Sequence, residues 1–411
     1  MYILNMLKRN SLLIALIIVM IGFELVIRCT GHGSLFSPQN FTNIIYQNSY
    51  VIILAVGMLF LIIGCGNIDL SVGSIVCLIG AVAGVMMVNN NCNIYMSMAV
   101  CLLLGMLIGA WHGFWIAYIR IPSFIVTLAG MLLFRGLSLI VLDGITINPF
   151  PDEYLDIFTS YFPAISPDVL ADYAGKTFDE MTRAEVKAAT YGIVFAKTMI
   201  VTVVIVEVYL IGIICGRVSK IKKGYEVEPM YAFLFKHVLI LVAIVASSIL
   251  LGQNKGIPVI LVLIATVVLI YAFIANKTVV GRRIYALGGN EKAAKLSGVN
   301  TNRLLFLSYV NMGLLAAVAA LVCVARFNSA SPMAGTGYEL DAIGSCFIGG
   351  ASAYGGVGTV GGAVIGAVFM GVLNNGMSIL GIDANIQKTV KGLVLLLAVV
   401  VDVMSKKRVS N

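Results

Sequence analysis

Long apolar runs separated by short polar stretches follow one another along almost the whole chain. About twelve of them approach the roughly 20 residues that a helix needs to cross the hydrocarbon core of a bilayer. Their approximate positions are 11–28, 46–64, 72–88, 95–118, 122–142, 193–215, 235–252, 257–275, 304–325, 339–352, 360–378 and 387–404. We therefore predict an all-α fold, a polytopic transmembrane helical bundle of about 10–12 spans.

Two of these runs differ from the others. The run at 339–352 is short and rich in glycine, so we expect a broken or re-entrant element, which is tolerated at membrane depth only where protein buries it. The first run follows Lys8 and Arg9, as the core of a secretory signal peptide would. No small-x-small cleavage site follows it, and we expect it to be retained as the first span.

The composition indicates a lipid environment. Hydrophobic residues make up 60% of the 411 positions and charged residues only 11%, against roughly 25% charged residues in soluble domains. The net charge of +8 does not indicate nucleic-acid binding, because the basic residues are confined to a few loops between apolar runs. The cysteines and histidines have no metal-ligand or catalytic spacing, so we expect no metal site, disulfide or catalytic residue.

Lysine and arginine predict the topology. They gather before the first run, between the fourth and fifth runs, in the loops 217–236 and 276–303, and in the C-terminal tail. With an even number of spans, all five groups lie on one side, which the positive-inside rule identifies as the cytoplasm. Both termini are therefore expected there. Lys388 and Lys391 are expected near the opposite face and contradict this pattern.

The segment 144–190 differs from the rest of the chain, with eight acidic residues, three basic residues and several prolines. The topology makes it an extracytoplasmic acidic insertion. We expect either a solvated loop or a docking surface for an external partner. Thr177 and Glu180 have the spacing of a capping box, which predicts a short helix through Ala189.

Some charged and polar residues lie close to or within the apolar runs. Asp69 lies in the turn Gly64–Ser74 before a helical run, where we expect it to cap the helix, either as a structural turn or as part of a substrate path. A carboxylate at the bilayer centre costs about 2.5–3.5 kcal/mol, so it requires a partner or water. Glu207 and Arg135 are each either functional groups or halves of buried pairs. For His112 we expect an interhelical hydrogen bond.

Two glycine motifs resemble nucleotide-binding sequences. Gly356-x-Gly358-x-x-Gly361 matches a dinucleotide fingerprint, but spans flank it and no soluble strand precedes it. We expect a close-packed turn between helices throughout the stretch Gly349–Gly362. Gly175-Lys176-Thr177 resembles the end of a phosphate loop, but position 170 is Leu and the segment is external. We therefore expect no ATPase site in this chain.

The loop 276–303 is expected in the cytoplasm and contains a short helix. Asn290 can cap it, and Gly298 can end it. We expect the helix to expose the small residues Ala293 and Ala294. It is either a basic anchoring segment or a coupling helix that docks into a cytoplasmic motor protein. As a coupling helix it would use Asn290, Glu291, Ala293, Ala294, Ser297 and Gly298.

Longer motifs are distributed over most of the chain: Asn67-Ile-Asp-Leu-Ser-Val-Gly-Ser74, Gly281–Gly298, Gly349–Gly362, Gly371-Val-Leu-Asn-Asn-Gly-Met377 and Val390-Lys-Gly-Leu-Val-Leu-Leu-Leu397. They resemble the permease subunits of bacterial ATP-binding-cassette (ABC) importers of the ribose and xylose type. The resemblance is closest to the multiple-monosaccharide branch, to which Trp115–Tyr118, Ile125–Gly136 and Gly224–Pro229 are also similar. Asn67 departs from the pattern, since many relatives have Gly or His there.

The resemblance implies a permease in the bacterial inner or plasma membrane that imports a monosaccharide by alternating access. It implies an ATP-binding subunit, which would hold ATP and Mg while this chain holds no cofactor. It also implies an extracytoplasmic sugar-binding protein and a second permease copy in a homodimer. Which sugar is carried stays open among xylose, arabinose, galactose and glucose.

A sugar is neutral and polar, so its path needs mainly hydroxyl and amide groups. The candidate path residues are Asn67, Asp69, Ser71, Thr127, Asn311, Asn374 and Asn375. Each of them is otherwise explained by a hydrogen bond between helices. The alternative function is a secondary sugar transporter or channel, for which Asp69, Glu207 and Arg135 are the candidate coupling groups.

Overall fold

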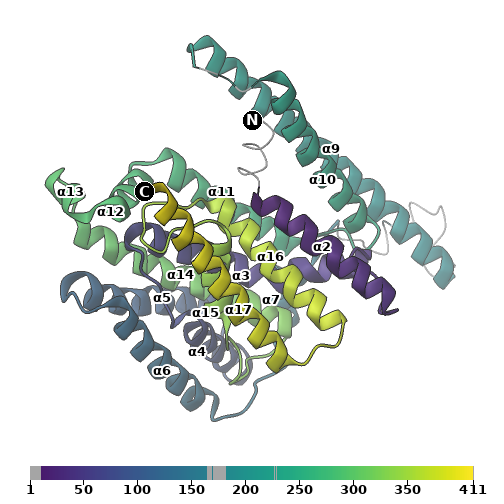
Figure 1. Ribbon diagram of the computed structural model, residues 1–411. Coiled ribbons are helices and arrows are strands. Elements are labelled where there is room, and N and C mark those ends of the chain that lie inside the picture. The colour runs from purple at the N-terminus through teal and green to yellow at the C-terminus, as the bar shows by residue number, and fades with distance from the viewer. Residues whose placement is uncertain (1–10, 164–168, 170–181, 226, 228, 411) are drawn as a thin grey trace. The chain divides into compact units, whose positions relative to one another are not determined.

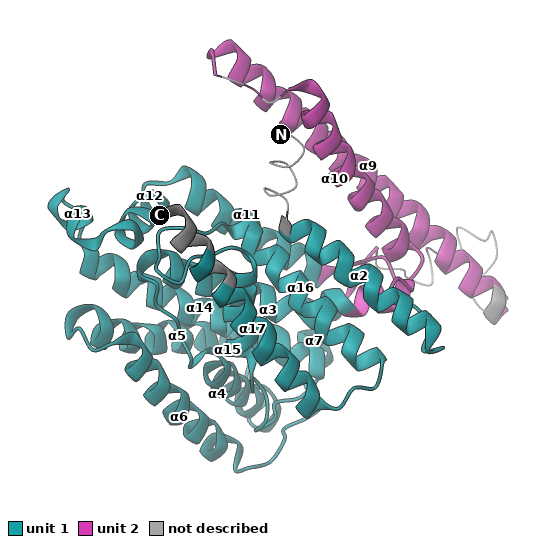
Figure 2. Ribbon diagram, in the orientation of Figure 1, with its two compact units in different colours: residues 1–35, 44–159, 260–411 teal, residues 36–43, 160–259 magenta. Residues whose placement is uncertain are grey.

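The computed structural model of the chain describes residues 11–163, 169, 182–225, 227 and 229–410 (Figure 1). The capping box expected at Thr177 and Glu180 lies outside the described residues. The chain divides into two compact units, which Figure 2 colours separately. Unit 1 comprises residues 1–35, 44–159 and 260–411, and unit 2 comprises residues 36–43 and 160–259.

Ten helices among the described residues are long and apolar enough to cross a membrane, which confirms the expected polytopic helical bundle. Those wholly or mostly in unit 1 are α2 (Ser11–Cys29), α3 (Pro38–Cys65), α4 (Val72–Gly84) with the π-helix η1 (Val85–Asn89), α5 (Ile94–Gly113) with η2 (Phe114–Tyr118), α6 (Ser123–Leu142), α11 (Val259–Lys277), α14 (Thr301–Phe327) and α16 (Val360–Ile379). The other helices of this unit are α7 (Asp152–Thr159), α12 (Val279–Gly289), α13 (Glu291–Leu296), α15 (Tyr338–Ile348) and α17 (Ala384–Ser410).

The helices α3 and α14 form the centre of unit 1. In the most apolar stretch of α3, 94% of the residues are buried, against 33% in α6 and 22% in α11. Glycines bring α14 close to α5, because a Cβ at Gly105 would overlap the Gly313 carbonyl and one at Gly109 would overlap the Tyr309 carbonyl. Such close contacts hold helices together in lipid, where no hydrophobic force drives them against one another.

The expected broken element is present at residues 328–348. Its first residues lie near the end of α6, where Ala330 and Ile147 exchange two backbone hydrogen bonds. The turn after its last residues lies at the end of α3, where the Gly356 N–H donates to the Ile63 carbonyl at 2.8 Å. Only 11 residues of this segment are helical, in α15, and they span about 16 Å. The segment therefore connects opposite ends of the bundle through a short helix and a non-helical stretch of chain that protein buries.

Arg135, in the middle of α6, holds the irregular half of this segment. Its Nη1 donates to the carbonyl oxygens of Pro332 (3.2 Å) and Ala334 (2.6 Å). Irregular backbone inside a membrane protein leaves carbonyl groups without helical partners, and an arginine can satisfy two of them at once. Arg135 is thus a structural residue of the broken element.

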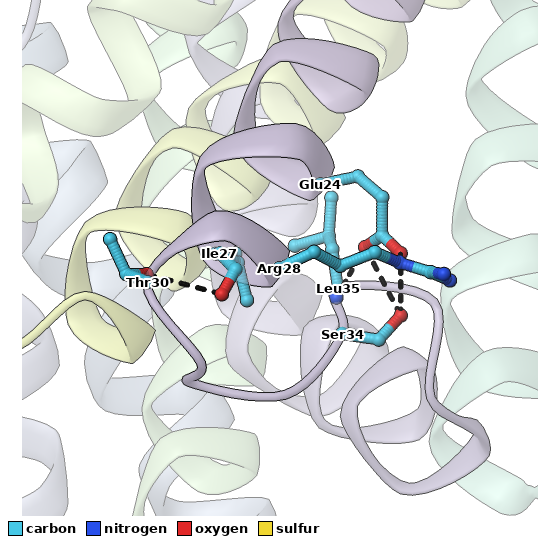
Figure 3. A network of polar contacts seen from close by, with 6 residues as sticks. All are labelled: Glu24, Ile27, Arg28, Thr30, Ser34 and Leu35. Atoms are coloured by element: carbon cyan, nitrogen blue, oxygen red, sulfur yellow. Dashed lines mark hydrogen bonds and ion pairs between the residues drawn. The ribbon is translucent and has the colours of Figure 1, made fainter.

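The helix α2 packs against α16. Near its end, Glu24 accepts hydrogen bonds from the Ser34 hydroxyl (2.8 Å) and the Leu35 N–H (2.7 Å) and pairs with Arg28 (Figure 3). This network compensates a carboxylate in an apolar helix and fastens the following loop to the helix end.

The acidic segment 144–190 is divided between the units. Residues up to 159 belong to unit 1, where the fully buried Tyr154 of α7 donates its hydroxyl proton to the Leu321 carbonyl at 2.7 Å. This first part packs onto α14 and is therefore not a solvated loop. The later described residues belong to unit 2.

Unit 2 is built on a helical hairpin of α9 (Arg183–Lys222) and α10 (Met230–Gly252). A short antiparallel pair, β1 (Tyr161–Phe162) with β2 (Ile257–Pro258), lies in the same unit. The 40 residues of α9 extend over about 60 Å, more than the thickness of a bilayer core. Glu207 is exposed on α9 without a partner among the described residues, so the alternative of a buried structural pair is wrong for this residue.

Candidate functional site

The N-cap residue of α4 is Ser71, which has no side-chain capping hydrogen bond, so the direct cap expected of Asp69 is not formed. Asp69 instead lies in the turn before the helix. It is 1% exposed, and its Oδ1 accepts hydrogen bonds from the Ser71 N–H (2.9 Å) and the Ser71 hydroxyl (2.6 Å). Two donors and the positive end of the α4 dipole compensate the buried carboxylate. The turn that presents it begins at Gly66, whose φ of +66° favours glycine.

His112 of α5 adjoins this turn. Its Nε2 lies 3.4 Å from the Ser71 hydroxyl, which matches the expected contact between helices. Gly130 on α6 leaves the room for the ring, because a Cβ there would overlap Nε2. His112 Nδ1 and Trp115 Nε1 are buried without a hydrogen-bond partner among the described residues. Buried polar atoms of this kind are uncommon and mark a place where a water or a polar ligand would be accommodated.

Asn67 and Thr127 belong to the same cluster. The Ser123 hydroxyl donates to Asn67 Oδ1 at 3.2 Å, which joins the turn to the start of α6. Thr127 is fully buried and donates to the Ser123 carbonyl at 2.9 Å within its own helix. Four of the seven expected path residues thus meet in one place. We call the set Asn67, Asp69, Ser71, His112, Ser123 and Thr127 the Asp69 cluster.

Asn374 and Asn375 lie elsewhere, on α16. Asn375 donates to Gln47 Oε1 at 3.1 Å, and Asn48 donates to the Ala367 carbonyl at 2.7 Å, so both contacts join α16 to α3. Gly371 makes room for Asn48, since a Cβ there would touch its amide. The Asn375 amide therefore makes the hydrogen bond between helices that was the alternative to a role in the path. Asn374 Oδ1 is buried without a partner among the described residues.

An ion pair between α15 and α17 escaped the sequence analysis. Lys391 Nζ lies 3.0 and 3.1 Å from the two carboxylate oxygens of Asp341, whose side chain is 3% exposed. Asp341 could have been recognised as an acid within the short run 339–352. The pair also explains why Lys391 contradicts the charge pattern. A lysine that is paired with a buried carboxylate is not a loop residue, so the positive-inside rule does not apply to it. Lys388 is exposed and keeps its contrary position.

Asn311 faces a different part of unit 1. It accepts a hydrogen bond from the Tyr271 hydroxyl of α11, and both residues line a cavity of about 430 Å³. The seven expected path residues therefore fall into three groups rather than one continuous lining.

The short helix expected in loop 276–303 is α13. Asn290 caps it by accepting the Ala293 N–H at 3.0 Å, and Gly298 ends it with a φ of +84°, as expected. Glu291 forms an ion pair of 2.8 Å with Arg120, so the helix is tied to the loop between α5 and α6. Ser297 donates to the Ala294 carbonyl at 2.8 Å and closes the last turn.

One detail of the expected surface of α13 is wrong. Ala293 is exposed, but Ala294 is only 4% exposed, because it lies on the helix face that turns back onto the protein. The exposed apolar residue is instead Leu296, at 90%. Small residues did not point to this position, although a leucine amid lysines in a polar loop is a recognisable signal.

The helix before α13 connects this surface to the membrane part. A Cβ at Gly288 of α12 would overlap the Ile63 carbonyl at the end of α3, and Gly356 approaches the same place. Tyr285 donates to the Gly358 carbonyl at 2.8 Å, and burial raises the pKa of its hydroxyl. The glycine-rich stretch is thus a close-packed turn, as expected, and it joins α12 to the broken element.

Comparison with known proteins gives a consistent result. A family model described as the permease component of the branched-chain amino acid transport system matches residues 40–170 and 183–399. The chain is 36% identical over 399 residues to the xylose transport system permease protein XylH of Escherichia coli K12, covering 97% of this chain and 93% of that protein. XylH of Haemophilus influenzae is 35% identical over 401 residues, with coverage of 97% and 96%.

The ribose import permease protein RbsC of Escherichia coli K12 is 32% identical over 397 residues, covering 97% of this chain and 94% of that protein. No solved structure matches. The family match extends over well more than half of the chain, and the similarity to the two kinds of sugar permease runs through nearly all of it. The chain belongs to the family of membrane permease components described for the branched-chain amino acid transport system.

Proposed function

We propose that this protein is the membrane-spanning permease of an ABC importer that carries a monosaccharide, with xylose and then ribose as the first candidates. The observation that carries the proposal is the 36% identity to a xylose permease over 97% of the chain. The family description names branched-chain amino acids, but a zwitterion needs charged partners along its path. In the described part of unit 1, the embedded charges Asp69, Asp341 and Arg135 have partners within the protein, and the unpartnered Glu207 lies in unit 2 on the exposed side of α9.

The alternating access of such a permease would be driven by a separate ATP-binding subunit that holds ATP and Mg, with no ATPase site in this chain. We place its contact at α13, where Asn290, Glu291, Ser297 and Gly298 shape the helix and Ala293 and Leu296 face outward. A displacement of α13 would reach the broken element through α12, whose Gly288 contacts both Ile63 and Gly356. Close-packed interfaces of this kind shift between discrete arrangements.

The Asp69 cluster is the part of the proposed path with the best chemistry for a sugar. It combines a compensated carboxylate, hydroxyl and amide groups, and the unpartnered Nδ1 of His112. Because most of its polar atoms already have partners, contacts with a sugar would be weak, which suits rapid release. Specificity would then lie mainly in an extracytoplasmic sugar-binding protein that delivers the substrate. A second permease copy would complete a homodimer.

We further propose that both termini lie in the cytoplasm of a bacterial inner-membrane protein. If the broken segment and α17 also cross the membrane, the ten candidate spans become twelve crossings. An even number of crossings places the loop 276–303 and the basic tail on one side. Cysteine accessibility at Lys292→Cys and at Asp143→Cys, read with an impermeant thiol reagent on intact cells, tests this: only the second should react in a background without the native cysteines.

Uptake of labelled xylose into proteoliposomes tests the function. Vesicles that hold this chain, the ATP-binding subunit and the binding protein should accumulate xylose only with internal ATP and Mg. Arabinose, galactose and glucose serve as competitors and rank the sugars. Uptake that needs no ATP-binding subunit and follows a proton gradient would instead establish a secondary transporter.

A further inference from the structure

A cavity of about 430 Å³ opens in unit 1 beside the coupling helix. Residues near the end of α11, from α12 and from the first half of α14 line it, together with Phe60 of α3. Its volume falls in the range of roughly 300–1,000 Å³ that small-molecule sites occupy. It belongs neither to the Asp69 cluster nor to the exposed side of α13.

Two arginines, Arg283 of α12 and Arg303 of α14, line the cavity. Both are exposed, and neither guanidinium group has an ion pair or hydrogen bond among the described residues. The lining contains no acidic side chain. Arg120 differs, because it is already paired with Glu291 at 2.8 Å. The cavity therefore offers two guanidinium groups whose charge is not compensated by the protein, and guanidinium groups bind phosphate with paired, directed hydrogen bonds.

The interior of the cavity is mainly apolar. Asn311 lies eight residues beyond Arg303 on α14, which is about 12 Å farther along the helix. It is bonded to Tyr271, so these deep polar groups satisfy each other. Phe60, Leu304 and Leu307 provide much of the remaining wall. The lining thus changes from cationic at the start of α14 to apolar along a spanning helix, which matches a molecule with an anionic head and a hydrocarbon tail.

We propose that this cavity binds an anionic phospholipid, with the phosphate between Arg283 and Arg303 and the glycerol and upper acyl chain against the apolar wall. Basic pockets between helices at the cytoplasmic membrane surface are suited to such headgroups. A free phosphate would contact only the arginines, and a sugar has no apolar part that would pack against the apolar wall. The assignment to the cytoplasmic leaflet follows the topology proposed above.

The bound lipid would also affect the coupling helix. Gly298, Val299 and Asn300, which connect α13 to α14, line the same cavity. Lipid in the cavity would fill the space under this connection and hold α13 in position relative to α14. Anionic lipid would then support coupling without contacting the sugar or ATP.

Titration of delipidated full-length protein with phosphatidylglycerol, followed by native mass spectrometry, tests the site. The double variant Arg283→Gln/Arg303→Gln should weaken binding about 30-fold, as expected for two basic residues near an anionic lipid. The matched control Arg282→Gln/Lys277→Gln removes the same charge from the same region, outside the cavity lining, and should change binding less than threefold. An equal loss of phosphatidylglycerol affinity in both double variants would show that only the general surface charge matters, and would overturn the proposal.

Two further measurements separate the possible ligands. Leu307→Trp should fill the apolar wall and weaken phosphatidylglycerol binding while both arginines remain. Millimolar inorganic phosphate should fail to displace the lipid, and phosphatidylcholine should bind more weakly. Displacement by phosphate, or an unchanged affinity in Leu307→Trp, would indicate an anion site without a lipid role. Loss of ATP-binding-subunit association in Arg283→Gln/Arg303→Gln with normal lipid binding would assign the arginines to that partner instead.

Discussion

The turn at Asp69 and the turn at Asn290 use one chemical device with opposite results. In each, a side-chain oxygen accepts an N–H group, which belongs to Ser71 just before α4 in the first turn and to Ala293 within α13 in the second. Asp69 is 1% exposed and its neighbours direct polar atoms inward, whereas the helix that Asn290 starts leaves Leu296 90% exposed. The comparison teaches that buried polar groups in this protein hold helices together, and it leads us to predict that Leu296 contacts another protein.

The two turns are physically connected. Asn290 directly follows α12, and Gly288 of this helix packs on Ile63 near the end of α3. Ile63 lies three residues before Gly66, where the turn that leads to Asp69 begins. A movement at the exposed turn would therefore be transmitted to the buried one, because the backbones touch at Gly288 with no side chain between them. We expect changes at the buried contacts to lower stability, and changes at the exposed helix to weaken coupling to the ATP-binding subunit.

The largest effect on stability is expected for Lys391→Ala. It leaves the Asp341 carboxylate buried without its partner, which costs about 3–5 kcal/mol of unfolding free energy. Thermal unfolding of the purified protein in detergent measures this as a lower Tm. Lys388→Ala, at an exposed position on the same helix, is the control and should leave Tm nearly unchanged. Asp341→Asn/Lys391→Met should recover most of the loss, and a failure to recover would mean that packing, not charge, dominates.

Asp69→Ala should cost less, about 1–3 kcal/mol, because the Ser71 N–H and hydroxyl lose their acceptor in a buried place. Asp69→Asn keeps an acceptor oxygen and should cost less than half as much. Chemical unfolding in a mild detergent compares the two variants. Equal destabilisation would show that the negative charge, rather than the hydrogen bonds, is what α4 requires.

Asn290→Ala should cost about 1 kcal/mol, the usual value for a lost N-terminal cap. The effect should be local, because α13 has only six residues. Hydrogen exchange of the Ala293 amide should become faster, while the amides of α14 keep their protection. Asn290→Asp supplies another capping oxygen and should restore slow exchange.

Leu296→Arg should have the smallest effect on stability, within about 0.5 kcal/mol, because the side chain is in water. It should nevertheless reduce association with the ATP-binding subunit at least tenfold, as expected of an apolar residue at the centre of an interface. Co-purification and ATP-driven uptake measure this loss. Lys292→Arg is the control on the same helix. Normal association of Leu296→Arg would remove α13 from the interface.

Local patterns in the sequence predicted much of the architecture. The apolar runs predicted the helices, Asn290 and Gly298 predicted the limits of α13, and the short run at 339–352 predicted a broken element that the structure places at 328–348. Each of these depends on residues close together in the chain. The sequence also predicted a polar turn around Asp69 before a helix, but it named Asp69 as the cap, whereas the N-cap residue of α4 is Ser71.

What the sequence by itself determined is that this chain spans a membrane repeatedly as a member of a permease family. Only the tertiary structure decided which polar groups pair with one another and which lie at the same cavity. Lys391 lies 50 residues from its partner Asp341, so no local pattern pairs them. Likewise, Arg303 lies 20 residues from Arg283, and no local pattern places both arginines at one cavity. The same holds for Ala294, whose burial depends on which face of α13 turns toward the protein. Periodicity reports that a segment is helical, but partners across the bundle are selected by packing in three dimensions.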